Sequence, residues 1–315
     1  MIVTLTPNPS VDRTFEVAEF TIGTVSRADA VRIEPGGKGL NVARTLVAGG
    51  HGVRAVVPVG GHDGELLSDE LADRGVTVVA VPIARPVRTN ISLVTPDGVV
   101  SKVNAPGPRL TGAEVRALRK ATVAELAGAE WLAGCGSLPP GAPADLYATL
   151  VREAQAAGVR VAIDASGAAL REAVAAGPDL IKPNREELAE LAGRELTSFG
   201  DVLGAARELI GWGVGAVVAS LGADGAVLVD TDGAWHATRP PIVPRSAVGA
   251  GDALLAGVLA AGGRGPEALR VGVAHGAAAA LLPGTAAPAP SDVDLEAVTV
   301  TPVDHHRPLT EGAHR

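Results

Sequence analysis

The sequence predicts an α/β fold with a mostly parallel central sheet, helices on both faces and a small β-sheet lid. Short Val- and Ile-rich runs alternate along the chain with Ala- and Leu-rich runs at helical spacing, and turn residues separate them. Strands that alternate with helices form parallel sheets covered on both faces. With 315 residues, 47% of them hydrophobic, the chain can bury a large core, so we expect one or at most two globular domains.

The elements of the main sheet follow from these runs in order. We expect strands at 2–6, 53–59, 77–81, 131–134, 160–164, 180–182 and 216–220. Helices are expected between them at 40–48, 64–74, 112–126, 144–157, 168–176, 186–192 and 201–210. The helix from 112 starts with a capping box, Thr111-Gly112-Ala113-Glu114, in which each end satisfies a backbone N–H of the other.

Two segments, 11–35 and 85–104, interrupt the alternation. They carry β-type residues and turn signals such as Pro96-Asp97-Gly98, without helical periodicity. Since both are β-like, we expect them to pair with each other as a lid across the mouth of the main domain. The polar residues from 305 onward are expected to be frayed.

Composition and charge argue against several classes of partner. The chain has 27 Lys and Arg against 35 Asp and Glu, a net charge of −8, and only three Trp, three Phe and one Tyr. An acidic chain with few aromatic rings is not expected to bind nucleic acid. No apolar run reaches the roughly 18 residues of a membrane helix, and the start of the chain lacks a signal peptide's pattern. Because Cys135 is the single cysteine, we expect no disulfide and a cytoplasmic location.

The strongest chemical signal is the Gly-rich turn Val248-Gly249-Ala250-Gly251-Asp252, which opens a fully apolar helix. Small residues let the backbone approach a ligand closely, and the first helical turn offers free N–H groups to an anion. The same positive end keeps Asp252 ionised, so this carboxylate could accept a hydroxyl proton as a general base. The alternative interpretation is that Asp252 only caps the helix.

A second Gly-rich element, Pro35-Gly36-Gly37-Lys38-Gly39-Leu40-Asn41, also leads into a helix. It places Lys38 and Asn41 about one turn apart. It is not a Walker A loop, because Arg32 and Gly39 stand where that motif requires Gly and Ser or Thr.

A third element, Lys182-Pro183-Asn184-Arg185-Glu186-Glu187, leaves a short apolar strand. Asn184 and Glu187 lie on one face of the helix that they begin, where an amide and a carboxylate suit a magnesium–nucleotide phosphate, held through water. The same spacing is also an N-cap with a reciprocal partner, and both roles can hold together.

Smaller polar signals fit the same pocket. The run Ser220 to Gly225 forms a tight turn after a buried strand, where a nucleotide could approach the backbone. The remaining candidates are Asp12 after the first strand, Arg88 and Asn90 at the start of the second lid segment, Lys102 and Asn104 at its end, and Ser137 in a Gly-Ser-Leu-Pro-Pro-Gly turn. Each could instead be an ordinary surface residue. The seven histidines are dispersed, so we expect no zinc site.

Together these motifs resemble those of the ribokinase-like (PfkB-type) carbohydrate kinases over nearly the whole chain, from residue 2 to about 301. The block Gly36-Gly37-Lys38-Gly39-Leu40-Asn41-Val42-Ala43 is similar to the family's N-terminal signature, and Gly249-Ala250-Gly251-Asp252 to its C-terminal one. Lys182-Pro183-Asn184-x-x-Glu187 is a third match. Within the family the chain most resembles the phosphosugar branch, the 1-phosphofructokinases, through residues 6–14, 88–90 and 102–108.

The resemblance implies a single kinase domain over residues 1–315 with a ribokinase-like three-layer fold, and phosphorylation of a ketohexose phosphate by ATP with Mg²⁺. The expected reaction converts fructose 1-phosphate to fructose 1,6-bisphosphate, with Asp252 as the base and the backbone of Gly249, Ala250 and Gly251 holding the transferring phosphoryl group. The residues that it assigns to the substrate are Asp12, Gly37, Lys38, Asn41, Arg88, Asn90, Lys102, Asn104 and Ser137, and those that it assigns to the nucleotide and its magnesium are Lys182, Asn184, Glu187, Ser220, Gly222 and Gly225.

Two other functions stay open. The substrate could be tagatose 6-phosphate or fructose 6-phosphate, or the chain could be a sugar-phosphate-binding regulator that has lost turnover. The retained Asp252 favours an enzyme, because a protein that only binds needs no base there. By analogy with the family, a homodimer formed through the lid is also expected.

Overall fold

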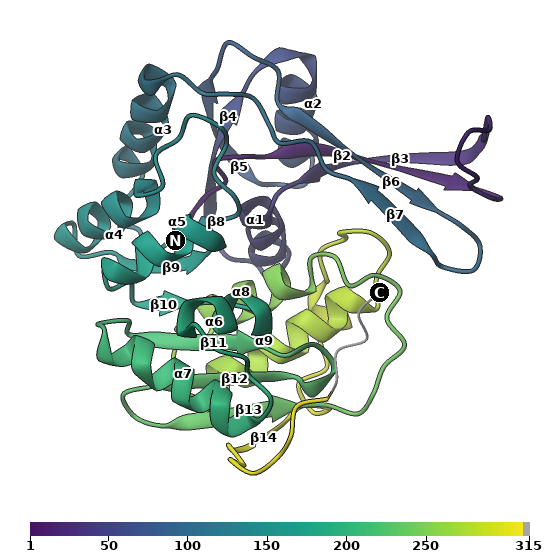
Figure 1. Ribbon diagram of the computed structural model, residues 1–315. Helices are drawn as coiled ribbons and strands as arrows, with labels where there is room; N and C mark the ends of the chain where they lie inside the picture. The colour runs from purple at the N-terminus through teal and green to yellow at the C-terminus, as the bar shows by residue number, and fades with distance from the viewer. Residues whose placement is uncertain (311–315) are drawn as a thin grey trace.

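The main sheet has the parallel core that the alternating pattern predicts. The computed structural model describes residues 1–310 (Figure 1). Within that range ten strands form one sheet, in the order β14 (Thr299–Pro302), β13 (Ala234–Thr238), β12 (Ala226–Asp230), β11 (Ala216–Ser220), β10 (Leu180–Ile181), β9 (Arg160–Asp164), β8 (Trp131–Cys135), β1 (Ile2–Leu5), β4 (Val53–Val59) and β5 (Thr77–Pro82). Neighbouring strands from β11 to β5 run parallel. The α/β prediction is confirmed.

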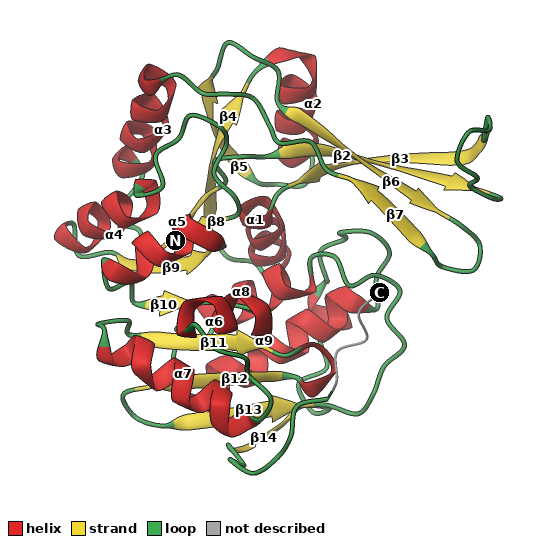
Figure 2. Cartoon of the chain, in the orientation of Figure 1, coloured by secondary structure: helices red, strands yellow, loops and turns green. Residues whose placement is uncertain are grey.

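Helices cover both faces of this sheet (Figure 2). One layer consists of α3 (Gly112–Ala124), α4 (Leu146–Ala156), α5 (Gly167–Ala175), α6 (Arg185–Ala192) and α7 (Phe199–Gly211), each packed on the next. On the other face α1 (Lys38–Ala48), α8 (Ala250–Ala260) and α9 (Gly265–Ala280) pack together, while α2 (Gly61–Ala72) lies beside β4 and β5. The bounds of α1 to α7 agree with the predicted helices to within three residues. The capping box at the start of α3 is confirmed, since the Glu114 N–H donates to Thr111 Oγ1 and the Thr111 N–H donates to the Glu114 carboxylate.

The sequence pattern missed the strands β12, β13 and β14, which extend the sheet in an antiparallel manner. A tight turn joins β12 to β13, in which Asp230 Oδ1 accepts hydrogen bonds from the N–H groups of Asp232 and Gly233. An alternation of strand and helix identifies parallel strands, because each needs a crossover helix. The strands β12 and β13 follow β11 through tight turns and therefore lack that signal.

The lid is confirmed as a separate sheet. It has the order β3 (Ala28–Gly36), β2 (Ser10–Val17), β6 (Arg88–Val94) and β7 (Val100–Val103). The two predicted segments pair through β2 and β6, which run parallel, with Asp12 opposite Asn90. In Figure 1 this sheet projects from the side of the main body.

The prediction of frayed residues from 305 onward is wrong for residues 305–310. The Thr310 N–H and Oγ1 each donate to the Asp224 carboxylate at 2.7 Å, and Leu309 is 7% exposed. The Phe199 N–H also donates to the Arg307 carbonyl. Residues 311–315 lie outside the described range. We call residues 305–310 the C-terminal strap.

None of the helices in the described range is both long and apolar enough to pass through a bilayer.

Candidate active site

The predicted site residues of the main domain gather at the carboxyl ends of the central parallel strands. Lys182 directly follows β10, and Ser220 ends β11. Two residues that the sequence analysis did not assign to the site, Asp164 at the end of β9 and Cys135 at the end of β8, lie at the same edge. Loops at these ends, together with the start of α8, form the usual ligand-binding edge of an open α/β sheet.

The Gly-rich turn has the geometry that the sequence suggests. Gly249 is the N-cap of α8 and has φ 82°, in the left-handed region that favours glycine. Asp252 lies in the first turn, is 7% exposed and accepts a hydrogen bond from Asn41 Nδ2 at 2.8 Å. No side chain caps this helix. The geometry therefore does not support the interpretation of Asp252 as a simple cap.

Asn41 is itself held in place from the other side. Arg44 donates to Asn41 Oδ1 at 2.7 Å and to the carbonyl and hydroxyl oxygens of Thr285 at 2.6 and 3.0 Å. The Asn41 amide group is thereby fixed with its nitrogen toward Asp252.

The environment of Asp252 gives its carboxyl a perturbed acidity. Burial and the charge of Asp164 raise the pKa of Asp252 to about 6, against the opposing effects of Asn41, Lys182 and Lys38. A carboxylate with a pKa near the working pH is suited to general-base catalysis.

An ion-pair network that the sequence analysis did not foresee lies beside this base. Asp164 is fully buried between two ammonium groups, with Lys38 Nζ at 2.7 Å and Lys182 Nζ at 3.1 Å. Burial opposes the ionisation of Asp164, but Lys182 and Lys38 outweigh it and lower its pKa. Lys38 Nζ also lies 3.9 Å from Glu187 Oε1. Although burial disfavours its charge, Asp164 and Glu187 raise the pKa of Lys38.

Asp164 has a sequence signal that could have revealed it. It is a carboxylate at the last position of a predicted parallel strand, and that edge was already expected to hold the ligand.

The nucleotide-side candidates lie together next to this network. Asn184 and Glu187 form the capping box of α6, with the Glu187 N–H donating to Asn184 Oδ1 at 2.8 Å and the Asn184 N–H donating to Glu187 Oε2 at 2.9 Å. Ser220 pairs with this loop, since its N–H donates to the Pro183 carbonyl at 3.0 Å. A Cβ added to Gly251 would lie 3.4 Å from Lys182 Nζ, so this ammonium group faces the Gly-rich turn.

The two glycines of the Ser220–Gly225 turn differ. Gly222 is exposed, and a Cβ there would meet nothing within 4 Å. A Cβ on Gly225 would collide with the Ala237 carbonyl of β13, so close strand packing already explains this glycine.

The residues present fit a magnesium ion held through water. In the range 1–310 no group of three or more His, Cys, Asp or Glu side chains could hold a metal directly. Glu187 uses Oε2 in the capping box, and its Oε1 accepts no hydrogen bond from the described residues. Mg²⁺ usually keeps several waters and takes one or two carboxylates, which is what Glu187 can offer.

On the lid side, Asp12 and Asn90 form one cluster. Ser10 Oγ and Asn90 Nδ2 both donate to Asp12 Oδ1, at 2.7 and 2.9 Å. A Cβ on Gly36 would collide with the Asp12 carboxyl, so glycine is required for this carboxylate to fit. Gly37, with φ 129°, then leads into α1.

Arg88 is held by backbone oxygens from two loops. It donates to the carbonyls of Ala105 at 2.8 Å and Asn8 at 3.0 Å. Asn8 Nδ2 in turn donates to Ser137 Oγ at 3.3 Å and to the Pro106 carbonyl at 3.1 Å. Asn8 therefore connects Arg88 with Ser137, a role that the sequence analysis did not assign.

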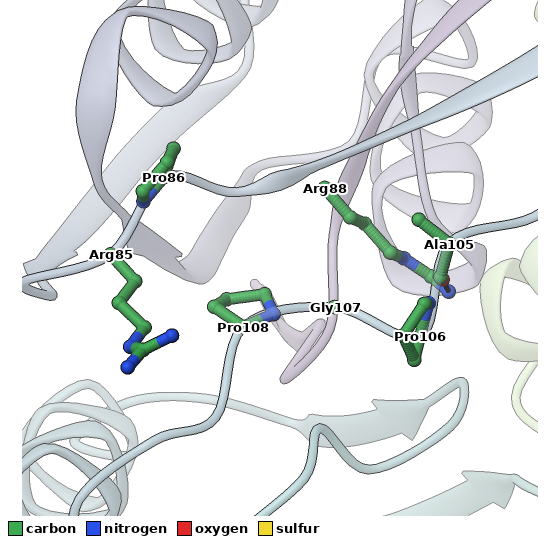
Figure 3. Close-up of a pocket in the computed structure, with 7 residues that line it drawn as sticks. All are labelled: Arg85, Pro86, Arg88, Ala105, Pro106, Gly107 and Pro108. Carbon is green, nitrogen blue, oxygen red and sulfur yellow. Dashed lines mark hydrogen bonds between the residues drawn. The ribbon is translucent and has the colours of Figure 1, made fainter.

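A cavity of about 310 Å³ lies at Arg88 (Figure 3). In the figure the Arg88 side chain extends from the start of β6 toward Ala105. The lining residues are Arg85, Pro86, Arg88, Ala105, Pro106, Gly107 and Pro108. Lys102 and Asn104, also expected here, are exposed on the lid. Burial lowers the pKa of Arg88 and of Lys102, and the negative charge of Asp12 opposes this effect at both. Lys38 is bound to Asp164 at the other end of the site.

Comparisons with known proteins identify relatives of this chain. The family model of the pfkB family carbohydrate kinases matches residues 6–292. A 1-phosphofructokinase of Rhodobacter capsulatus is 42% identical over 261 residues, which cover 82% of each chain. The ATP-dependent 6-phosphofructokinase isozyme 2 of Escherichia coli strain K12 is 38% identical over 290 residues, 90% of this chain and 94% of the relative.

Solved structures give the same result for the fold. Phosphofructokinase-2 from Escherichia coli superimposes with a TM-score of 0.86 at 36% identity, covering 93% of this chain and 96% of that one. Ribokinase from Thermotoga maritima, at 22% identity, has a TM-score of 0.74 and covers 93% and 97%. The ribokinase-like fold is thus confirmed, and the chain belongs to the pfkB family of carbohydrate kinases.

Proposed function

We propose that this kinase transfers a phosphoryl group from ATP to the 6-hydroxyl of fructose 1-phosphate, giving fructose 1,6-bisphosphate and ADP. The observation that carries the proposal is Asp252, a buried carboxylate with a raised pKa in the first turn of α8, directly after a turn of free backbone N–H groups. In this position it accepts the proton of the attacking hydroxyl while the new O–P bond forms and the bond to ADP breaks.

Charge on the transferring group is stabilised by the surroundings of that base. The N–H groups of Gly249, Ala250 and Gly251 donate to the phosphoryl oxygens, and Lys182 faces the same turn. A magnesium ion held through water by Glu187 and Asn184 would neutralise the nucleotide phosphates. Ser220 and Gly222 then contact the nucleotide from the adjoining turn.

The lid and its neighbouring loops would hold the sugar phosphate. Asp12, Asn90 and Asn41 present carboxylate and amide groups to sugar hydroxyls. Arg88, Lys102 and Ser137 would hold the phosphate already present, since a guanidinium group binds a dianion by charge-assisted hydrogen bonds. The position of that phosphate decides which hydroxyl reaches Asp252.

The network around Lys38 supports a different task for this residue within the same site. Because Lys38 pairs with Asp164 and Glu187, its ammonium lies with the nucleotide-side groups. We therefore assign it to the transferring phosphoryl group and not to the phosphate at the Arg88 end.

The test is a comparison of steady-state rates, measured as ADP release, for fructose 1-phosphate, fructose 6-phosphate, tagatose 6-phosphate and fructose. We expect kcat/KM for fructose 1-phosphate to be higher by about 10²-fold, because a misplacement of about 1 Å costs that much. A higher value for fructose 6-phosphate, the substrate type named for the Escherichia coli relative, would replace the substrate assignment and keep the kinase. Sugar-phosphate binding without ADP release would instead establish a regulator.

We further propose that residues 1–315 act as one kinase domain in the cytoplasm and pair through the lid as a homodimer. Alternation along the lid strands places the polar site residues on one face and apolar residues on the other. On that apolar face Val31, Ile33, Ile91 and Val103 are 37 to 66% exposed. An exposed apolar sheet face marks an interaction surface.

A further inference from the structure

We propose that Asp63 is a positioning residue that sets the lid strands β2 and β6 at the angle in which Asp12, Arg88 and Asn90 reach the sugar phosphate. This inference rests on the proposed function. Asp63 lies in the first turn of α2, outside the residues expected to touch either substrate.

The two oxygens of the Asp63 carboxylate hold two different strands of the lid. Arg13 of β2 donates to Oδ1 at 2.9 Å, and the Thr89 hydroxyl of β6 donates to Oδ2 at 2.8 Å. The Arg13 and Asp63 side chains are 33% and 23% exposed, so water screens this ion pair in part. Its contribution to overall stability is therefore small, and its effect lies in geometry.

The strand register makes this contact an attachment on the back of the site. Arg13 follows Asp12, and Thr89 lies between Arg88 and Asn90. In a strand successive side chains point to opposite faces, so Arg13 and Thr89 point away from the face that carries Asp12 and Asn90. Asp63 therefore binds the lid on the face opposite the substrate-binding residues, through Arg13 and Thr89.

The start of α2 is also where the second lid segment leaves the main domain. The Val87 N–H donates to the Gly60 carbonyl at 3.0 Å, and a Cβ on Gly61 would lie 2.6 Å from Pro86 Cβ. These contacts fix residues 86 and 87 at the start of α2. Asp63 then holds Thr89, two residues further along in β6. Without the carboxylate, β2 and β6 remain paired with each other but lose their joint connection to α2.

The test compares Asp63→Ala with the wild-type enzyme. We expect the KM for the sugar phosphate to rise about tenfold, with the KM for ATP changed less than about twofold, because only the lid side loses its orientation. Arg88→Ala, which removes a direct contact, should raise the same KM further. Asp69→Ala removes an exposed carboxylate from the same helix and serves as the matched control.

Conservative variants separate positioning from general destabilisation. Asp63→Asn should restore most of the sugar-phosphate KM, since its amide can accept from Arg13 and donate to the Thr89 hydroxyl. Thr89→Val should raise the KM while Thr89→Ser should not, and Asp63→Ala with Thr89→Val should be non-additive. The comparison of Thr89→Val with Thr89→Ser keeps the test decisive if Asp63→Ala fails to fold.

An unchanged sugar-phosphate KM in Asp63→Ala and Thr89→Val, or an equal rise in both KM values, would overturn the inference. A wild-type enzyme that releases no ADP with any of the four sugars would overturn the proposed function instead. In that event, titration calorimetry with fructose 1-phosphate decides the role of Asp63. Weaker binding in Asp63→Ala supports positioning, and equal binding refutes it.

Discussion

Burial opposes the negative charge of Asp252, although catalysis requires that charge. Replacing this residue should therefore lower the activity and raise the stability. Asp252→Asn should lower kcat by about 10²–10⁴, because the general base is lost while the backbone N–H groups that hold the phosphoryl remain. ATP binding should survive. Steady-state kinetics and nucleotide titration check both points, and unaltered turnover would remove Asp252 from the chemistry.

The same variant should be more stable at neutral pH. The pKa of Asp252 is raised from an ordinary value of 3.8 to about 6, so the folded chain keeps a proton that the unfolded chain releases between these values. Stability therefore falls as pH rises from about 4 to 6, and the penalty is fully present above pH 6. Asn can still accept from Asn41 without a charge. We expect the free energy of unfolding, measured by urea denaturation, to rise by on the order of 1–3 kcal/mol at pH 7.5 and to be unchanged at pH 3.5.

The charge of Asp164 should contribute, after burial, to the acid limb of the pH profile. In the wild type kcat/KM should fall as pH drops below about 6, because Asp252 then takes up a proton. Asp164→Asn removes a negative charge that raises the pKa of Asp252 and leaves Lys38 and Lys182 nearby, so the acid limb should move to lower pH. A limb that stays in place would show that the charge of Asp164 does not raise this pKa.

At the start of α6, Asn184 and Glu187 cap the helix and are also proposed to hold the magnesium ion. Glu187→Gln keeps the capping box, because Gln can accept from the Asn184 N–H as Glu does. We expect a higher magnesium concentration for half-maximal rate and an unchanged melting temperature. Asn184→Ala removes the cap and should cost about 1 kcal/mol. If Glu187→Gln melted earlier but kept its normal magnesium dependence, the pair would serve only as a cap.

The C-terminal strap is a second element whose contribution can be measured. Leu309 is 7% exposed, and its N–H donates to the Thr197 carbonyl at 2.9 Å. Leu309→Ala should reduce the free energy of unfolding by about 2 kcal/mol, the lower end for buried leucines. The control Val243→Ala, at a position 87% exposed, should change it by less than about 0.5 kcal/mol. Equal effects would mean that the strap does not contribute to the core.

For the whole molecule, the lid offers a test of assembly. Val103 is 66% exposed on the apolar lid face, so Val103→Glu would place a charge in the proposed dimer interface. Sedimentation equilibrium should show the dimer weakened at least about tenfold, while Val243→Glu leaves it intact. A mass independent of Val103 would place the interface elsewhere or leave the chain a monomer.

The sequence alone determined the features that depend on neighbours along the chain. Strand and helix periods, the capping box at Thr111 and the Gly-rich turn ahead of Asp252 all arise within a few residues, so their patterns are visible in the sequence. The same holds for the Asn184 and Glu187 pair. The two lid segments were recognisable because they break a regular alternation.

The tertiary structure decided which distant groups meet. Lys38 and Asp164 are 126 residues apart, Asn41 and Asp252 are 211 apart, and Arg13 reaches Asp63 across 50 residues. A side chain's own sequence neighbourhood does not state its partner, because the parallel sheet brings strand ends together from all parts of the chain. For this reason the role of Lys38 and the attachment of the lid at Asp63 followed from the packing of the strands and not from any motif.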